Sequence, residues 1–295
     1  MGLGTNQFKG KMETILDRIV ATKREEIAHL KQQLPLEKIR EQAAAQPHAL
    51  DFVGALRGSR PRQAGNATVN IIAEVKQGSP SKGTFSWHGD AARQGLAYQQ
   101  GGAKAISVVT DGPFFKGSVA MLQAVKQAVT LPVIQKEFLL EPYQVQYARS
   151  LGADACLLIA AILPGGQLED MIGLAREAGL FTLVEVVNEE ELTRALAGGA
   201  EVIGVNNRDL RTFKTDPDHT LRLLPAIGEG AVAVTESGIH TRSDVERMLA
   251  AGVDAFLIGE ALMVADDPTA HLKILRGEAG ASDNAGTTPR VEALP

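Results

Sequence analysis

A short pattern of polar and apolar positions recurs four times along the chain. Each copy has a Gly, a small or branched residue, one polar residue and then an apolar run that favours β structure. The copies read GGAKAISVV, LGADACLLI, GGAEVIGVN and AGVDAFLIG. The glycine directly before the small or branched residue is Gly102, Gly152, Gly199 or Gly252, and the spacings between copies are 50, 47 and 53 residues. A repeat this regular indicates an internally repeated architecture.

Four more apolar runs lie between these copies, at residues 69–75, 132–138, 181–187 and 231–237. Together the two sets predict eight strands, each followed by a stretch of helical pattern such as EEELTRALAGG. Because parallel strands need crossover helices, eight alternating units favour an α/β protein with a closed (β/α)8 TIM barrel. An open doubly wound sheet is the alternative, but no GxGxxG turn follows any of these strands.

The two ends of the chain differ from this repeat. Residues 12–46 have a helical pattern ahead of the first strand, and Pro35 is expected to interrupt it. The C-terminal tail is polar and contains Gly, Thr and Pro, which is typical of disorder. We therefore expect a helical extension over residues 1–50 packed on the barrel, a barrel over 51–276, and a disordered tail over 277–295.

Composition and charge narrow the class of protein. The formal net charge is −5, with 30 Lys and Arg against 35 Asp and Glu, and no basic run stands out, so a nucleic-acid partner is not expected. No stretch approaches the roughly 18 apolar residues of a membrane span, and no signal-peptide core precedes the helical segment. We expect a cytoplasmic protein without a membrane partner; its oligomeric state is left open, and a monomer is compatible with the sequence.

Metal and disulfide chemistry are not predicted. Cys156 is the single cysteine and lies in the apolar run ACLLIAAIL, where it is expected to serve packing. The six histidines show no paired metal-ligand spacing, so no metal site is proposed.

Charged residues stand at the ends of several predicted strands, although burying unpaired charge is costly. Glu74 and Lys76 are two residues apart, so they share one face of the first strand. Neither suits the apolar helix interface, and both are therefore predicted to point into the barrel lumen near its C-terminal rim. The matching ends of other strands carry Lys136, Glu185, Asn206 and Glu236.

The charged members of this set fall on the first, third, fifth and seventh predicted strands. Alternate strands supply one layer of lumen side chains, so these residues are predicted to surround one point. Any single strand-end charge is more often a structural ion pair. Their shared register favours a functional pocket that contains both acids and amines.

Glycines and polar loops at the same rim predict a phosphate group on the substrate. Gly238 and Gly259 follow the seventh and eighth strands where helices begin, and backbone N–H groups without a neighbouring Cβ favour phosphate. The long polar segment QGSPSKGTFSW follows Lys76. Ser79 or its loop backbone could bind an anion and Lys82 could cover the pocket, while a solvated surface loop is the alternative. A small phosphorylated molecule is the expected partner.

Segments from nearly every predicted strand form a recognisable set: IAEVKQGSPSKG, VVTDGPFFKGS, VIQKEF, GADACLLI, LVEV, IGVNNRDLRTF, VTESGI and GVDAFLIGEALM. In this order they resemble the indole-3-glycerol phosphate synthase family of tryptophan biosynthesis, and the resemblance covers roughly residues 12–273. It implies a carboxy-lyase that closes the indole ring of 1-(2-carboxyphenylamino)-1-deoxyribulose 5-phosphate, releases CO2 and water, and uses no metal or organic cofactor.

The resemblance also implies roles for individual residues. Lys136 would be the general acid that protonates the substrate carbonyl, Lys76 would bind the carboxylate and support ring closure, and Glu185 would be the general base of the dehydration. Glu74 and Asn206 would position substrate and orient protons. Positions that match substrate-binding or phosphate-binding segments of the family are Ser79, Phe138, Leu157, Arg208, Glu236, Ser237, Gly238 and Gly259.

Two other classes of function fit parts of the pattern. One is another phosphosugar barrel enzyme: an isomerase of the same pathway, or an aldolase that uses Lys136 or Lys76 as a Schiff-base nucleophile. The other is a catalytically silent phosphate-binding barrel, against which the complete set of charged groups argues.

Overall fold

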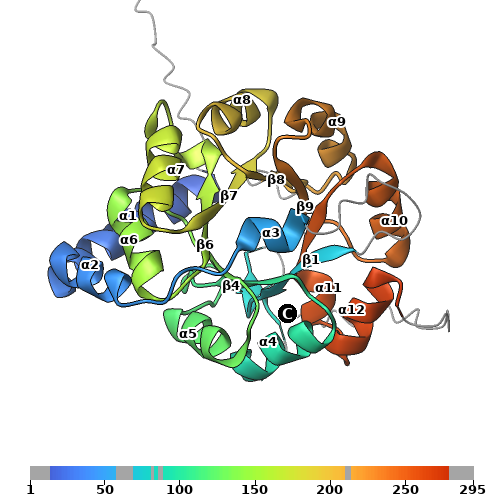
Figure 1. Ribbon diagram of the computed structural model, residues 1–295, viewed down its shortest axis with the longest axis horizontal. Helices are drawn as coiled ribbons and strands as arrows, with labels where there is room; N and C mark the ends of the chain where they lie inside the picture. Colours follow the sequence, from blue (N-terminus) through green and yellow to red (C-terminus); the bar gives the residue numbers. More distant parts are fainter. Residues whose placement is uncertain (1–13, 58–68, 81–82, 86–88, 210–213, 279–295) are drawn as a thin grey trace, which may run out of the picture.

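Eight parallel strands form a closed barrel in the computed structural model, which describes residues 14–57, 69–80, 83–85, 89–209 and 214–278 (Figure 1). The first barrel strand pairs with both the second and the last, which closes the sheet. The barrel strands are β1 (Asn70–Val75), β4 (Ala105–Val109), β5 (Val133–Lys136), β6 (Ala155–Ile159), β7 (Phe181–Val186), β8 (Val202–Asn206), β9 (Val232–Glu236) and β10 (Ala255–Ile258). The predicted (β/α)8 barrel is confirmed, and the open sheet is wrong.

Helices surround the strands on the outside of the barrel (Figure 1). They are α4 (Ala91–Gln100), α5 (Val119–Ala128), α6 (Pro142–Ser150), α7 (Gln167–Glu177), α8 (Glu189–Ala197), α9 (Asp218–Ile227), α10 (Arg242–Ala251), α11 (Glu260–Met263) and α12 (Pro268–Arg276), with a 3-10 turn, η1 (Ala160–Ile162), after β6. Each barrel strand except β10 is followed by one of the longer helices, and β10 is followed by both α11 and α12.

The recurring sequence pattern marks the turn from a helix into the next strand. Its glycines share a positive φ, from 78° to 98°, which is the left-handed region that favours glycine: Gly102, Gly152, Gly199 and Gly252. In two copies the polar residue ties neighbouring strands together. Asp154 accepts the N–H of Val133 at 2.7 Å, and Asp254 accepts that of Ala233 at 2.9 Å. The repeat therefore specifies a left-handed turn and, in these two copies, a side-chain hydrogen bond to the neighbouring strand.

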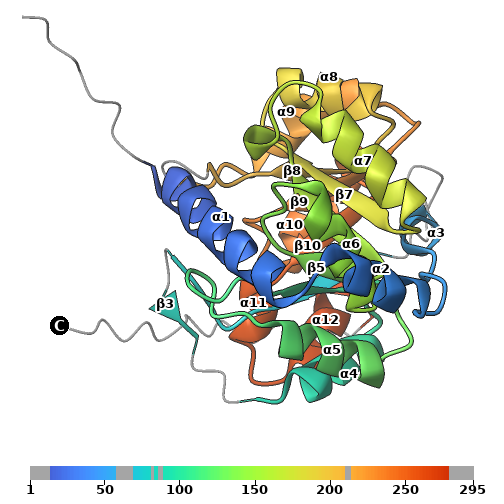
Figure 2. The same cartoon turned by 90° about the vertical axis from the view of Figure 1, so that its left-hand side faces the viewer.

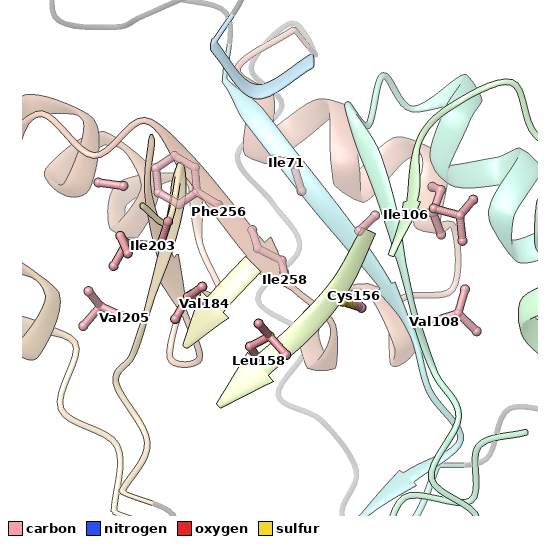
Figure 3. Close-up of a cluster of buried hydrophobic side chains, with 14 of the residues drawn as sticks. Ile71, Ile106, Val108, Cys156, Leu158, Val184, Ile203, Val205, Phe256 and Ile258 are labelled. Atoms are coloured by element: carbon pink, nitrogen blue, oxygen red, sulfur yellow. The ribbon is translucent and has the colours of Figure 1, made fainter. Parts of the chain in front are cut away.

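Alternate strand residues pack into two separate apolar layers. Ile71 and Val75 of β1 belong to the layer between strands and helices, part of which Figure 3 shows around Ile71 and Ile258. Ile72 packs instead in the lumen, with Ile134 among others. Since Glu74 has the same parity as Ile72, its side chain faces the lumen, as the strand pattern predicts.

The segment before β1 forms three helices, α1 (Ile15–Gln33), α2 (Leu36–Ala44) and α3 (Phe52–Arg57). Pro35 stands at the N-cap of α2, so the predicted interruption is confirmed. α1 begins with a capping box in which Thr14 and Asp17 satisfy each other's backbone N–H groups.

Two of these helices, α1 and α3, pack against the lumen layer from opposite ends. Phe52 and Leu56 of α3 pack into the lumen layer, and the Asn70 side chain donates to the Leu56 carbonyl at 2.8 Å. Ile19 of α1 joins the same layer, and α1 lies on the opposite side of the barrel from α3 (Figure 2).

A short antiparallel hairpin follows β1, formed by β2 (Gly78–Ser79) and β3 (Gly83–Thr84). It lies on the same side of the barrel as α1 (Figure 2). Lys82, residues 1–13 and the tail from residue 279 lie outside the described residues, so the covering lysine and the disordered tail stay predictions. No helix among the described segments is long and apolar enough to span a membrane.

Candidate active site

A pocket opens at the C-terminal ends of the barrel strands, and we call it the rim pocket. Its lining includes all the residues that the sequence assigns to a site: Glu74, Lys76, Ser79, Lys136, Phe138, Leu157, Glu185, Asn206, Arg208, Glu236, Ser237, Gly238 and Gly259. Seven barrel strands or the loops after them supply these residues. The strand-end positions therefore meet in one place, as their shared register predicts.

Lys136 ends β5, and its ammonium lies between two carboxylates. Its Nζ is 2.6 Å from Glu236 Oε2 and 3.6 Å from Glu185 Oε2. The three residues come from β5, β7 and β9, which are alternate strands of the barrel, so their side chains meet in one lumen layer. The Lys136 side chain is 19% exposed, against 4% for Glu185 and 2% for Glu236. Lys136 thus has the most exposed side chain of this cluster.

Burial and neighbouring charges set the protonation of this cluster. Burial alone would lower the pKa of Lys136, but Glu236, Glu185 and Glu74 outweigh it and raise the pKa above its ordinary value. Burial raises the pKa of Glu236 to about 7, helped by the negative charges of Glu185 and Glu74 and opposed by Lys136. Lys136 is therefore charged at neutral pH, and Glu236 exchanges its proton close to neutrality.

Glu74 and Lys76 form a second acid–amine pair in the pocket. Lys76 Nζ is 2.7 Å from Glu74 Oε1, and their side chains are 14% and 3% exposed. Burial would raise the pKa of Glu74, but Lys76, Lys136 and Arg208 together lower it. Glu74 is therefore a charged carboxylate despite its burial.

Asn206 links Glu185 to the loop after β8. Its Nδ2 donates to Glu185 Oε1 at 3.1 Å, while its Oδ1 accepts the backbone N–H of Arg208 at 3.0 Å. Arg208 in turn lies 3.5 Å from Glu260 Oε2. These contacts fix the orientation of the Glu185 carboxylate.

One side of the rim pocket is aromatic and apolar. The rings of Phe115 and Phe138 have centroids 5.9 Å apart and are tilted by 39°. Both line the pocket together with Leu157. A flat aromatic ligand would find favourable contacts on such a wall.

The loop after β9 turns through two left-handed residues, Ser237 with φ of 67° and Gly238 with φ of 80°. A side chain other than glycine seldom adopts this conformation, and such residues cluster at functional sites. Asn207 braces the turn, since its Nδ2 donates to the Ser237 carbonyl and to Thr235 Oγ1, each at 2.9 Å.

Sequence reasoning missed several contributors to the site, among them Phe115 and Asn207. Phe115 lies in a loop, where strand parity gives no orientation. Asn207 directly follows the predicted Asn206 and is 3% exposed, so the doubled Asn at a strand end was the available signal.

The single cysteine lies away from the rim pocket. Cys156 is fully buried in the helix-facing layer, where burial raises the pKa of its thiol to about 12. Within the described part of the chain, no group of three or more His, Cys, Asp or Glu side chains could hold a metal ion.

Comparison with known proteins agrees with this architecture. Among solved structures, thiamine phosphate pyrophosphorylase from Pyrococcus furiosus is similar, with a TM-score of 0.53 and 17% identity over 71% of this chain and 95% of that chain. At this identity the likeness shows the fold alone. The family profile described as indole-3-glycerol phosphate synthase matches residues 16–275, which contain the whole rim pocket. The chain therefore belongs to the indole-3-glycerol phosphate synthase family, which is a family of carboxy-lyases.

Proposed function

We propose that the rim pocket converts 1-(2-carboxyphenylamino)-1-deoxyribulose 5-phosphate to indole-3-glycerol phosphate, CO2 and water, with Lys136 as general acid and Glu185 as general base. The observation that carries this assignment is the Lys136 ammonium, held between Glu236 and Glu185 beside an aromatic wall. The family match supports the overall reaction, and the geometry supports the individual roles.

Ring closure needs a proton at the substrate carbonyl. The ring carbon that carries the carboxylate attacks the carbonyl carbon, a C–C bond forms, and the carbonyl oxygen takes a proton from Lys136. An ammonium suits this step because it is protonated at neutral pH and belongs to the most exposed side chain of its cluster.

Lys76 would hold the substrate carboxylate during ring closure. Its partner Glu74 is charged, which keeps the lysine side chain in place without removing it from the pocket. Cleavage of the C–CO2 bond then returns its electron pair to the ring and restores aromaticity.

Dehydration needs both a base and an acid. Glu185 would accept the proton from the former methylene carbon, while the hydroxyl group made in the first step leaves as water with a proton from Lys136, which lies 3.6 Å from Glu185 and has regained its own proton from solvent. Asn206 orients the carboxylate for this transfer through its 3.1 Å hydrogen bond.

The phosphate would bind at the loops after β9 and β10, where Ser237, Gly238 and Gly259 line the pocket. The left-handed turn at Ser237 and Gly238 presents backbone groups that a regular strand would pair. Ser79 lines the pocket from the hairpin after β1 and would add a hydroxyl donor.

The charge state of Lys136 argues against an aldolase. A Schiff-base lysine must be a neutral amine, which requires a depressed pKa. Here the carboxylates raise the pKa of Lys136, which opposes loss of its proton.

Turnover of the synthetic ribulose phosphate by the purified protein tests the proposal. We expect indole fluorescence to appear together with one equivalent of CO2. A folded protein that yields no indole product would overturn the assignment, and covalent capture of substrate by borohydride would favour the aldolase.

Gly204→Ala is expected to lower kcat by roughly ten- to a hundredfold with only a small loss of stability. A Cβ at position 204 would lie 2.0 Å from Glu236 Oε1, so the carboxylate must move away. Because that carboxylate ends a flexible side chain, its displacement costs little folding energy, but it breaks the 2.6 Å contact that holds Lys136. Steady-state kinetics and thermal unfolding measure the two effects.

Gly173→Ala is the matched control, since a Cβ at position 173 of α7 meets no atom within 4 Å. We expect unchanged kcat and equal or slightly higher stability, because Ala favours helices by up to about 1 kcal/mol over Gly. A Gly204→Ala enzyme as active as this control would contradict the argument.

A further inference from the structure

A buried ion cluster lies beside the rim pocket, between the N-terminal helix and the barrel, and one of its members, Glu137, also lines the pocket. Lys23 of α1 is 4% exposed. Its Nζ is 2.6 Å from Glu26 Oε2, 3.0 Å from Glu137 Oε1 and 3.2 Å from Asp111 Oδ2. A lysine this buried on a helix outside the repeat calls for an explanation, since its desolvation is costly.

Two of the three carboxylates organise loops that form the rim pocket. Asp111 follows β4, and its Oδ1 accepts the backbone N–H groups of Phe114 and Phe115 at 2.9 and 3.1 Å. Glu137 follows Lys136, and it accepts the backbone N–H of Phe138 and the hydroxyl of Thr110, each at 2.8 Å.

The loops that these carboxylates organise carry the aromatic wall and the ammonium of the pocket. Phe115 and Phe138 are in ring contact, and Lys136 directly precedes Glu137 in the chain. Lys23 therefore closes a network that joins α1 to both loops, although it does not line the pocket itself.

The charges of the cluster depend on Lys23. Burial raises the pKa of Glu137, and Lys23 is the largest opposing influence. The side chain of Asp111 is 1% exposed, so loss of the ammonium would leave two buried acids without their common cation. One of them must then take up a proton or move toward water, and either change releases its loop.

We propose that Lys23 is a positioning residue for the reaction, which acts through Asp111 and Glu137 to hold the loops after β4 and β5 in their catalytic arrangement. The inference rests on the proposed function and extends it to the N-terminal helix. It assigns α1 a part in catalysis beyond covering the lumen.

Lys23→Met is expected to lower kcat by roughly tenfold or more at a temperature where the variant is fully folded, since small displacements of reacting groups are costly. Lys23→Arg keeps the cation and is expected to recover most of this loss. The measurements are steady-state kcat and KM with the ribulose phosphate, beside circular dichroism and thermal unfolding.

Lys126→Met provides the matched control for general destabilisation. Lys126 also pairs with a buried carboxylate, at 2.5 Å from Asp154 Oδ2, but this pair lies where α5 leads back to the N-terminal ends of the strands. We expect a lower melting temperature with kcat within about twofold of wild type.

The outcomes separate this inference from the proposed function. A folded wild type without turnover would overturn both, whereas a Lys23→Met enzyme with wild-type kcat would overturn this inference alone. If Lys23→Met does not fold, Asp111→Asn carries the test, because Asn can still accept the two backbone N–H groups but loses the charge that meets Lys23. A fall in the kcat of Asp111→Asn by roughly threefold or more, which a shifted loop would cause, supports the positioning role of Lys23. An unchanged kcat overturns it.

Discussion

Replacing Lys136 with Met is expected to lower kcat by roughly a thousandfold or more, because the reaction loses the group that protonates the carbonyl. Binding of substrate should suffer far less, since the aromatic wall and the phosphate-binding loops are untouched. Neither CO2 nor indole should then form in a single turnover, because decarboxylation follows ring closure. Stopped-flow fluorescence and a CO2 assay measure both products.

Lys136→Arg separates charge from proton transfer at this position. A guanidinium still meets Glu236 and Glu185, but its pKa above about 12 prevents it from giving up a proton at neutral pH. We expect this variant to fold normally and to be almost as inactive as Lys136→Met. Activity within tenfold of wild type would mean, since general acids contribute roughly a hundredfold or more, that the positive charge alone is what the reaction needs.

The stability of Lys136→Met follows from the same cluster. Loss of the Lys136 ammonium leaves Glu236 buried without the cation that lies 2.6 Å from its Oε2. Because Glu236 already has a pKa of about 7, it can take up a proton at small cost, so the variant should be less destabilised below pH 7 than above it. The direction follows from the raised pKa of Glu236 in the folded protein. Such a carboxyl group favours folding while it is protonated, so its contribution to the free energy of unfolding falls as the pH rises from the ordinary carboxyl pKa toward the raised one.

The barrel and the composition of its rim could be predicted from the sequence because both follow from strand parity. The rim residues have the same parity as apolar lumen residues on their own strands, and in a closed barrel side chains of that parity face the lumen. They are Glu74, Lys136, Glu185 and Glu236. The recurring glycine gave the period, since each copy needs a left-handed residue at the same turn.

Loop conformations and long-range ion pairs could not be predicted in this way. Lys23 is one of several charged residues on a helical stretch, and no local pattern shows that it meets Asp111 and Glu137. The space that Gly204 leaves for Glu236 is likewise invisible, because it depends on how two neighbouring strands are paired. Such features depend on tertiary contacts between segments far apart in the chain.

The Glu185→Gln variant is expected to lower the rate of indole formation by roughly a hundred- to ten-thousandfold, because it removes the base of the dehydration. Glutamine has the shape of glutamate, and its amide oxygen can still accept the hydrogen bond from Asn206 Nδ2, which is 3.1 Å long in the wild type. The geometry of the pocket should therefore be retained. Like-charge repulsion on Glu236 also falls, since Glu185 helps to raise the pKa of that group. Stability at pH 8 should therefore be equal to that of the wild type or higher.

Single-turnover experiments distinguish Glu185→Gln from Lys136→Met. If Glu185 acts after decarboxylation, this variant should release one equivalent of CO2 per site without the fluorescence of the indole product, whereas Lys136→Met should release neither. Glu201→Gln, an exposed carboxylate near the N-terminal end of β8, serves as the control and should match the wild type in both signals. Absence of CO2 from Glu185→Gln would place its proton transfer before the loss of the carboxylate, and the dehydration would then need a different base in the same pocket.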